Sequence, residues 1–337
     1  MKRKVFFTLL LSATLLAGSC SRQEAAFKTY EGFALGTTYS ISVKGTADQF
    51  EDLQQDIDSV IERANDTYSI YNENSRLSRI NRNETTELGP HLVYLLEVAE
   101  IVHSLSGGRY DVTILPLKEA YGFQAGLPQQ EGVDTDSLLR YVGQDKISIL
   151  DGHIVKKLPE VRIDLNSVAK GYTVDCMSRM LDERGFTDYL VDIGGETFCR
   201  GANPKNQDWK IGIETPAEGN YVKGNSIERV ISVTGKGMAT SGNYRNFHTD
   251  SKGRKYTHII NPLTGENTES SLLSATVVAN TCAVADALAT MFIALGLEDA
   301  KKVVDAYPEL AVLMIYADRD GSMKTTWSNA MSPYVAQ

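Results

Sequence analysis

Cysteine is scarce in this chain, which has four in 337 residues. Cys20 stands near the amino terminus, and Cys176, Cys199 and Cys282 follow at unrelated spacings, so neither a disulfide framework nor a zinc motif is visible. Cys176 and Cys282 lie within apolar patterns of helical period. We interpret these two as small core residues rather than reactive thiols.

Concentrated positive charge is also absent. The 34 Lys and Arg residues are outnumbered by 43 Asp and Glu residues, which gives a formal net charge of −9, and basic residues do not cluster beyond the first few positions. Nucleic acid is therefore not expected as a partner, because its phosphates bind to concentrated basic surface.

Internal repeats and low-complexity segments are missing as well, and 42% hydrophobic with 23% charged residues is an ordinary globular composition. This excludes a disordered, collagen-like or simple coiled-coil chain. At 37.1 kDa the chain is long enough for one large core or two smaller ones, and we expect two lobes that share a cleft.

The amino terminus has the pattern of a targeting signal. Basic residues 2–4 precede an apolar run over residues 5–17 that is too short to span a bilayer. The sequence Leu-Leu-Ala-Gly-Ser-Cys at residues 15–20 resembles a bacterial lipobox, with Ala17 where Leu is commoner. We expect cleavage just before Cys20 and a lipid on that cysteine. The alternative is a plain secretory signal in which Cys20 is incidental.

These features predict a membrane-anchored lipoprotein that faces the periplasm. Residues 1–19 are expected to be the signal peptide, residues 20–30 a tether, and residues 31–337 the folded domain.

Apolar periodicity places helices and strands along the rest of the chain. Several strands follow one another, which favours an α+β fold over a doubly wound α/β fold. Helices are predicted over residues 50–64, 91–106, 168–184, 281–295 and 299–307, and strands over residues 39–43, 146–149, 161–165, 189–193, 209–214, 230–233, 275–279 and 310–316.

The first candidate site is the junction of a predicted strand and helix at residues 162–172. Asp164, Asn166, Ser167 and Lys170 are crowded there. The free N–H groups and the positive dipole end of a helix start favour phosphate binding, to which Lys170 would add charge. The alternative is that Asn166 or Ser167 only caps the helix.

The second candidate site is the pair Asp286 and Thr290, which stand four residues apart on one face of an Ala-rich helical pattern. Both oxygens can approach the same hard cation, and an Asp in an apolar helix is costly to bury unless it is paired. Mg²⁺ takes about six oxygens, so phosphates, carbonyls or water must complete the set. The alternative is a solvated Asp with Thr bonded to its own backbone.

Three further segments are candidates for lining a pocket. His258 precedes a Pro and Gly turn and is the residue type that accepts a proton near neutral pH, although a lone His in a strand is often structural. Residues 239–244 have the composition of a polar turn. Residues 192–196 contain a Gly pair that permits either close approach to a ligand or a β-turn, without the spacing of a dinucleotide fingerprint.

Seven segments stand in order along nearly the whole mature chain. Together they resemble the motifs of the ApbE family, the FAD:protein FMN transferases. They are residues 35–37; residues 68–71 with 75–81; residues 108–113 with 116–117; residues 164–172; residues 241–242; residues 258–265; and residues 285–290.

The resemblance implies a T-fold-related, two-lobed α+β domain with a cleft for FAD and Mg²⁺. Its implied activity is Mg²⁺-dependent transfer of FMN from FAD to a threonine hydroxyl of target proteins, with release of AMP. The targets would be subunits of membrane redox complexes. His258 would be the catalytic base, and Asp286, Thr290 and the backbone carbonyl of Ser167 would bind Mg²⁺. Contacts to FAD would come from Leu35, Tyr71, Arg109, Tyr110, Asp111, Asp164, Lys170 and Ile260.

The chain departs from the family pattern at four positions. Leu35 stands where the family has Met, Tyr110 where Phe is usual, Asn166 where Gly is frequent, and Asn243 where Asp is frequent. None of these removes a metal ligand or His258, so flavin affinity and target choice are the properties affected.

Two other functions remain open from the sequence. A periplasmic FAD pyrophosphatase would use water in place of threonine and yield FMN and AMP at the same site. A non-catalytic flavin-binding or solute-binding lipoprotein is disfavoured, because simple binding needs no combination of His258, Asp286 and Thr290.

Overall fold

The computed structural model describes residues 24–123, 133–216, 226–243, 247–249, 255–257, 259–267 and 270–336. Cys20 and His258 therefore lie outside the described residues. Within those ranges no helix combines the length and the apolar character needed to cross a membrane.

An eight-stranded sheet is the centre of the fold, and all its neighbouring strands are antiparallel. In β2, Tyr39, Ile41 and Val43 are buried while the residues between them are partly exposed, which is the alternation that a half-buried strand requires. In spatial order the strands are β1 (Ala26–Ala34), β2 (Thr37–Gly45), β5 (Tyr189–Ile193), β6 (Glu196–Arg200), β9 (Lys236–Gly242), β12 (Leu272–Ala279), β13 (Ala311–Ala317) and β14 (Met323–Trp327).

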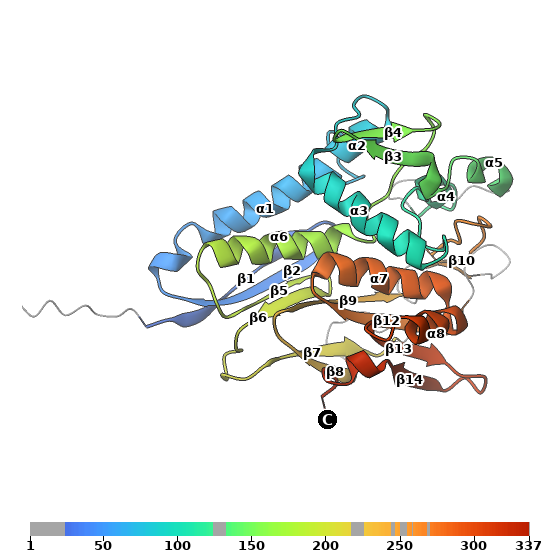
Figure 1. Ribbon diagram of the computed structural model, residues 1–337. Coiled ribbons are helices and arrows are strands. Elements are labelled where there is room, and N and C mark those ends of the chain that lie inside the picture. The colour runs from blue at the N-terminus through green and yellow to red at the C-terminus, as the bar shows by residue number, and fades with distance from the viewer. Residues whose placement is uncertain are drawn as a thin grey trace, which may run out of the picture.

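Helices cover one face of this sheet (Figure 1). The two central ones are α6 (Ala169–Glu183) and α7 (Cys282–Leu295), flanked by α1 (Leu53–Tyr68) and α8 (Leu297–Ala306). Nearly every residue of α7 is buried, because the helix lies between the sheet and α3 (Gly89–Leu105). Its alanines allow this close packing on both sides.

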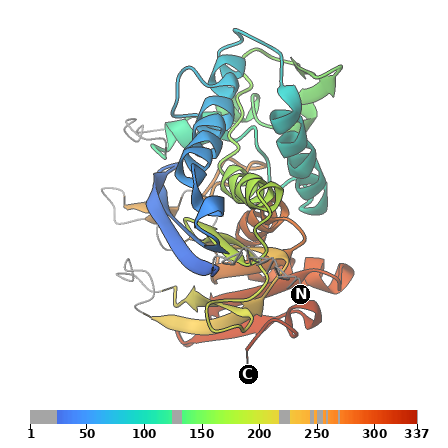
Figure 2. The same ribbon diagram turned by 90° about the vertical axis from the view of Figure 1, so that its left-hand side faces the viewer.

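A further group of elements lies beyond α6 and α7, on the side away from the sheet (Figure 2). Besides α3, it contains α2 (Arg76–Asn81), α4 (Leu115–Ala120), α5 (Thr135–Leu139), β3 (Ile147–Leu150) and β4 (His153–Lys156).

On the opposite face of the sheet, β7 (Trp209–Glu214) and β8 (Ile227–Val233) close a separate apolar cluster around Trp209 and Ile231. The remaining short elements are β10 (Phe247–Thr249), β11 (Lys255–Thr257), η1 (Asp48–Phe50), η2 (Gln144–Lys146) and η3 (Asn329–Met331).

An antiparallel sheet with its helices on one face is an α+β fold, which confirms the predicted class. The strand predicted over residues 161–165 is wrong. Only an isolated bridge between Ile114 and Arg162 forms there. The Asn81 side chain makes the hydrogen bonds that a neighbouring strand would otherwise make. Its amide oxygen accepts from the backbone N–H of Ile163, and its amide nitrogen donates to the Ile163 carbonyl, both at 2.8 Å.

The expected tether over residues 20–30 also needs correction, because β1 begins at Ala26 and pairs with β2 from its first residue. As the edge strand of the sheet, β1 buries only Tyr30 and Ala34. Its sequence therefore lacks the strong alternation that marks an inner strand.

Candidate functional site

The start of α6 is the point at which most of the predicted site residues meet. The segments that lead into it run side by side, since the N–H of Asp164 donates to the carbonyl of Val112 at 2.7 Å. This pairing brings Tyr110 and Asp111 next to Asp164 and Ser167, although the two segments are about fifty residues apart in the chain.

The side chains of Asn166 and Ser167 do not cap α6. The residue at the N-cap position is Val168, which makes no capping hydrogen bond. The Ser167 hydroxyl is hydrogen-bonded to the Tyr110 hydroxyl at 2.9 Å, and the Asn166 amide donates to the Tyr71 hydroxyl at 3.3 Å. The simple capping alternative is therefore wrong for both residues.

A carboxylate from another helix takes the capping role. Asp286, on α7, accepts a hydrogen bond from the backbone N–H of Gly171 at 3.0 Å, and it is only 2% exposed. The helices approach so closely that a Cβ on residue 171 would lie 2.3 Å from the Cys282 carbonyl oxygen and 2.8 Å from the Asp286 Cβ. Only glycine fits at this position.

Thr290 lies one turn beyond Asp286 on α7. Its hydroxyl is hydrogen-bonded to the Ser241 hydroxyl at 3.1 Å. The alternative of a solvated Asp beside a Thr bonded to its own backbone is therefore wrong. Ser241 is part of β9, so residues 239–242 form strand where a polar turn was expected.

Lys170 and Glu196 add two opposite charges beside Asp286. The Lys170 ammonium is paired with Glu196 Oε1, while Glu196 Oε2, which is buried, has no hydrogen-bond partner in the described part of the chain. Glu196 follows the Gly pair at residues 194–195, and those glycines form the β-turn between β5 and β6. The sequence marked residues 192–196 as a candidate segment for their Gly pair, but it assigned no role to the Glu196 carboxylate.

Burial governs the protonation of these three groups. It raises the pKa of Glu196 and of Asp286, and the positive charge of Lys170 opposes both shifts. Burial alone would lower the pKa of Lys170, but the charges of Glu196 and Asp286 outweigh it and raise that pKa. When all three groups are ionised, one negative charge is left over.

The donor set fits a hard cation that brings further ligands of its own. Asp286 offers a carboxylate, Thr290 a hydroxyl, and Glu196 Oε2 is a buried acceptor without a donor. The described residues contain no cluster of three His, Cys, Asp or Glu side chains in the arrangement of a metal site. Water or phosphate oxygens would therefore have to supply part of the coordination.

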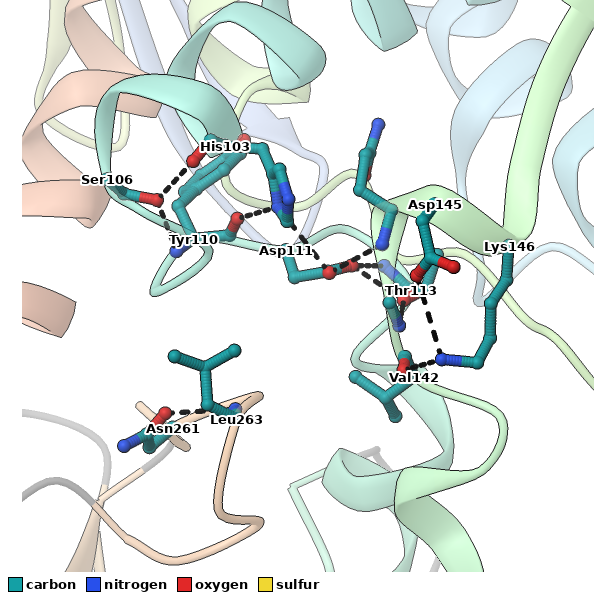
Figure 3. A network of polar contacts seen from close by, with 12 residues as sticks. His103, Ser106, Tyr110, Asp111, Thr113, Val142, Asp145, Lys146, Asn261 and Leu263 are labelled. Carbon is teal, nitrogen blue, oxygen red and sulfur yellow. Dashed lines mark hydrogen bonds and ion pairs between the residues drawn. The ribbon is translucent and has the colours of Figure 1, made fainter.

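Asp111 organises the loop before α4 (Figure 3). Its carboxylate accepts from the N–H and hydroxyl of Thr113 at 2.8 and 2.6 Å, and from the N–H of Gln144 at 2.8 Å. His103 Nδ1 lies 3.5 Å from the same carboxylate and is hydrogen-bonded to the Tyr110 carbonyl at 2.8 Å. Asp111 therefore fixes the backbone that carries Tyr110.

Asp164 is held in a similar way. One of its oxygens accepts from the Asn166 N–H at 2.8 Å, and the other is paired with the ammonium of Lys118, on α4. Asp164 is buried and the Lys118 side chain is only 17% exposed, so this pair is shielded from water. Lys118 was not predicted from the sequence, where its only signal was its place directly after the Pro-Leu of residues 116–117.

Four predicted FAD residues lie further out. Tyr71 is 56% exposed, and Leu35 occupies the turn between β1 and β2, where it lines a cavity of about 500 Å³. Arg109 lies 3.8 Å from Asp299, at the start of α8, and Ile260 is buried against the side chains around Leu117. In the described ranges, no hydrogen bond or ion pair joins Leu35, Arg109 or Ile260 to the residues around α6.

The antiparallel sheet with helices on one face defines an α+β protein. Its central helices place buried carboxylates, an ammonium and hydroxyls at one helix start, and these groups form a site for a charged ligand. The chain matches the model of the ApbE family over residues 35–314, so it belongs to this family. This confirms the resemblance found in the sequence.

Relatives and solved structures agree with this assignment. The chain is 33% identical to the FAD:protein FMN transferase of Vibrio cholerae, covering 97% of this chain and 98% of the relative, and 30% identical to that of Escherichia coli, covering 96% and 94%. The flavin transferase ApbE structure from Vibrio cholerae superposes with a TM-score of 0.80 at 31% identity, covering 92% of this chain and 99% of that one. The apo flavinyl transferase ApbE of Pseudomonas stutzeri gives 0.80 at 25% identity, covering 92% and 97%.

Proposed function

We propose that this protein transfers FMN from FAD to threonine hydroxyls of target proteins and releases AMP. The observation that carries the proposal is the contact between Asp286 and the start of α6, where Lys170 and a helix dipole lie beside a buried carboxylate. FAD contains a pyrophosphate, and helix starts and ammonium groups are the usual partners of phosphate oxygens. Family membership and the relatives' printed activity support the same function.

We propose that Mg²⁺ accompanies FAD in this site. Asp286 and Glu196 outweigh Lys170, so the bare site would repel a pyrophosphate unless a cation lay between them. Asp286, Thr290 and the backbone carbonyl of Ser167 would hold the ion. The ion would supply Lewis acidity and charge neutralisation at the pyrophosphate.

The proposed FAD contacts divide by chemistry. Lys170 would bind phosphate, Tyr110 and Asp164 would shape the wall beside it, and Asp111 would hold that wall in place. Leu35 is partly exposed and Tyr71 is largely exposed, so a flat aromatic ring would have room to pack against both side chains. Arg109 and Ile260 are proposed as the remaining contacts.

We propose His258 as the base that accepts the threonine proton. The threonine oxygen forms a bond to the FMN phosphorus, the bond between the two phosphates breaks, and AMP leaves with that electron pair. General-base assistance contributes about 10² to 10⁴-fold in rate. His258→Ala should therefore transfer FMN far more slowly while its FAD affinity, measured by fluorescence titration, stays near that of the parent.

One experiment separates the candidate functions. The protein is incubated with FAD, Mg²⁺ and a domain that carries threonine-linked FMN in its mature form but was expressed without a transferase. A fluorescent band in a denaturing gel, with a mass gain of one FMN on threonine, supports transfer. Free FMN and AMP without that band would indicate a pyrophosphatase, and unchanged FAD would indicate a binding protein.

We further propose that Cys20 carries a lipid and anchors the protein at a membrane, facing the periplasm. The lipobox-like sequence supports this. Such a location suits targets that are subunits of membrane redox complexes.

A further inference from the structure

A groove of about 970 Å³ lies outside the proposed FAD site, between α3 and the segment that leads into β3. One wall is a stripe of α3, where Glu97, Glu100, Ile101 and Ser104 share a face at helical spacing. The other wall includes Gln144, Asp145, Ile147, Ser148, Ile149 and Ile154.

The walls of the groove expose apolar side chains to an unusual degree. Ile101 is 68% exposed near the C-terminal end of α3, and Ile149 is 39% exposed on β3. Leu150 and Val155 are exposed on the same β3–β4 hairpin, but they do not line the groove. Exposed apolar side chains that face one groove, as Ile101 and Ile149 do, are typical of a contact surface for another molecule.

The polar groups of the groove are mainly hydrogen-bond acceptors. Glu97 and Glu100 are exposed and have no ion-pair partner among the residues that the structure describes. The Gln144 side chain is only 5% exposed and its Oε1 is buried, so it is not accessible from the groove. An occupant that brings positive charge would pair with Glu97 and Glu100, whereas an acidic occupant would be repelled.

The groove is connected to the proposed FAD site through two of its lining residues. Gln144 donates its backbone N–H to Asp111, and His103 is hydrogen-bonded to the Tyr110 carbonyl (Figure 3). Gly108, which also lines the groove, directly precedes Arg109. A molecule seated in the groove would therefore lie against the backbone that carries the proposed flavin contacts.

We propose that this groove docks the acceptor protein, through a segment that combines apolar side chains with Lys or Arg. The proposal rests on the proposed transferase function, since a transferase must hold a second protein near its site. Anionic lipid does not fit, because Glu97 and Glu100 would repel it. A symmetric contact with a second copy would place the same two carboxylates opposite themselves or their neighbours.

Binding is tested first with peptides. The probe is a fluorescein-labelled peptide of alternating Leu and Lys, and its control replaces Lys by Glu. The parent is expected to bind the Lys peptide, with the double variant Glu97→Lys/Glu100→Lys about ten-fold weaker or more, and with Ile101→Ala also weaker. Equal binding of both peptides by the parent, or an unaffected double variant, would overturn the proposal.

The matched control reverses two exposed acids elsewhere, in Asp305→Lys/Glu309→Lys. Asp305 lies on α8, which α7 separates from α3 (Figure 1), and Glu309 follows α8. This control should bind the Lys peptide as the parent does. A parent that sediments as a dimer, which only the groove variant dissociates, would assign the groove to self-association and also overturn the proposal.

Transfer kinetics then connect the groove to function. The groove variant is expected to raise KM for the acceptor domain about ten-fold while kcat and FAD affinity remain those of the parent. In the parent, that KM should rise with salt, because the contact is between charges. An unchanged KM contradicts acceptor docking. A parent that transfers no FMN contradicts the proposed function instead, and the peptide experiment still decides whether the groove binds a basic segment.

Discussion

At the scale of single residues, the central feature is a pair of buried carboxylates that share one partly exposed ammonium. Glu196 and Asp286 are each at most 3% exposed, and Lys170 is the cation that stabilises both. Burying carboxylates without full compensation costs free energy. A site that keeps such a cluster is arranged to receive a further positive charge, which is the role proposed for Mg²⁺.

Asp286→Asn tests the cation directly. Asn keeps an oxygen for the Gly171 N–H, so the contact between α6 and α7 is retained while the charge is lost. We expect transfer at limiting Mg²⁺ to fall about 10²-fold or more, because a metal ion contributes several kcal/mol to charge stabilisation. Added Mg²⁺ should restore part of it. Near-parental turnover at limiting Mg²⁺ would contradict the role, and Asp305→Asn on the surface of α8 is the control.

A second prediction compares the stability of variants at Lys170 and Glu196. Lys170→Met leaves two buried carboxylates without their cation, and it should lower the free energy of unfolding by about 3 to 5 kcal/mol, the usual cost of an uncompensated buried charge. Glu196→Gln leaves Lys170 beside Asp286 and should cost clearly less. Urea unfolding of both variants measures the difference. Equal losses, or a larger loss in Glu196→Gln, would show that Lys170 does not serve both carboxylates.

The sequence revealed those site residues whose partners are local. Asp286 and Thr290 are one helical turn apart, so their shared face is readable from spacing alone. Lys118 and Asp175 were missed, and Glu196 was given no role, because their partners come from remote segments. The partner of Glu196, for example, is 26 residues away on another element.

At the scale of elements, α6 and α7 cap each other. Asp286 of α7 accepts from the third N–H of α6, and Asp175 of α6 accepts from the N–H groups of Cys282 and Ala283 at 2.7 and 2.8 Å. Each helix thus supplies a carboxylate to the positive end of the other. This exchange fixes the two helices relative to each other at the place where the proposed ligand binds.

Titration of Asp175 should make the free energy of unfolding depend on pH. Burial raises its pKa from 3.8 to about 6, although the two N–H donors lower it. Between about pH 4 and 6 the folded state therefore binds more protons at this residue than the unfolded state, so its contribution to stability falls as pH rises. Relative to Asp175→Asn, the parent should lose up to about 3 kcal/mol between pH 4 and pH 7.5.

Urea unfolding at several pH values measures this difference between the two proteins. The exposed Asp305→Asn variant should show no such trend. A difference between parent and Asp175→Asn that is constant with pH would contradict the raised pKa.

Element boundaries were predicted well for only some of the elements that bury a face against the core, because α1 and β12 differ from the predicted 50–64 and 275–279 by three or four residues at an end. Residues 189–193 and 209–214 form strands with the predicted bounds, and α7 differs by one residue. The prediction failed at residues 161–165, where a remote Asn side chain bonds the backbone, and at β1, where edge exposure weakens the alternation. The local apolar pattern indicates neither a hydrogen bond from a remote side chain nor the position of a strand at the edge of a sheet.

At the scale of the whole molecule, the chain enters the fold at the end away from the proposed site. The first residue of β1, Ala26, pairs with Gly45 of β2. Gly45 lies against the side chain of Phe186, since a Cβ added to this glycine would lie 2.6 Å from the Phe186 ring. Phe186 follows the C-terminal end of α6. The site lies at the other end of this 15-residue helix, a separation of about 22 Å. An anchor at Cys20 would thus hold the molecule by the end opposite its site.

This arrangement sharpens the prediction for Cys20. Two acyl chains contribute roughly 0.8 kcal/mol per buried CH₂, which is enough for firm attachment. Cys20→Ser should move the protein to the soluble fraction. Because the entry point is remote from the start of α6, its transfer of FMN to a soluble acceptor should equal that of the parent.

The proposed anchor at Cys20 would also limit which acceptor threonines the protein reaches. Only five residues, 21–25, separate Cys20 from Ala26 at the start of β1, and a fully extended chain over these six residue steps spans about 20 Å. The proposed site lies a further helix length away from the anchor, so acceptor threonines should lie well clear of the bilayer surface. A longer linker inserted after residue 24 should extend the range of acceptors that the protein reaches. Mass spectrometry of the mature amino terminus tests the premise: an unlipidated start at another residue would contradict the anchor while leaving the transferase proposal intact.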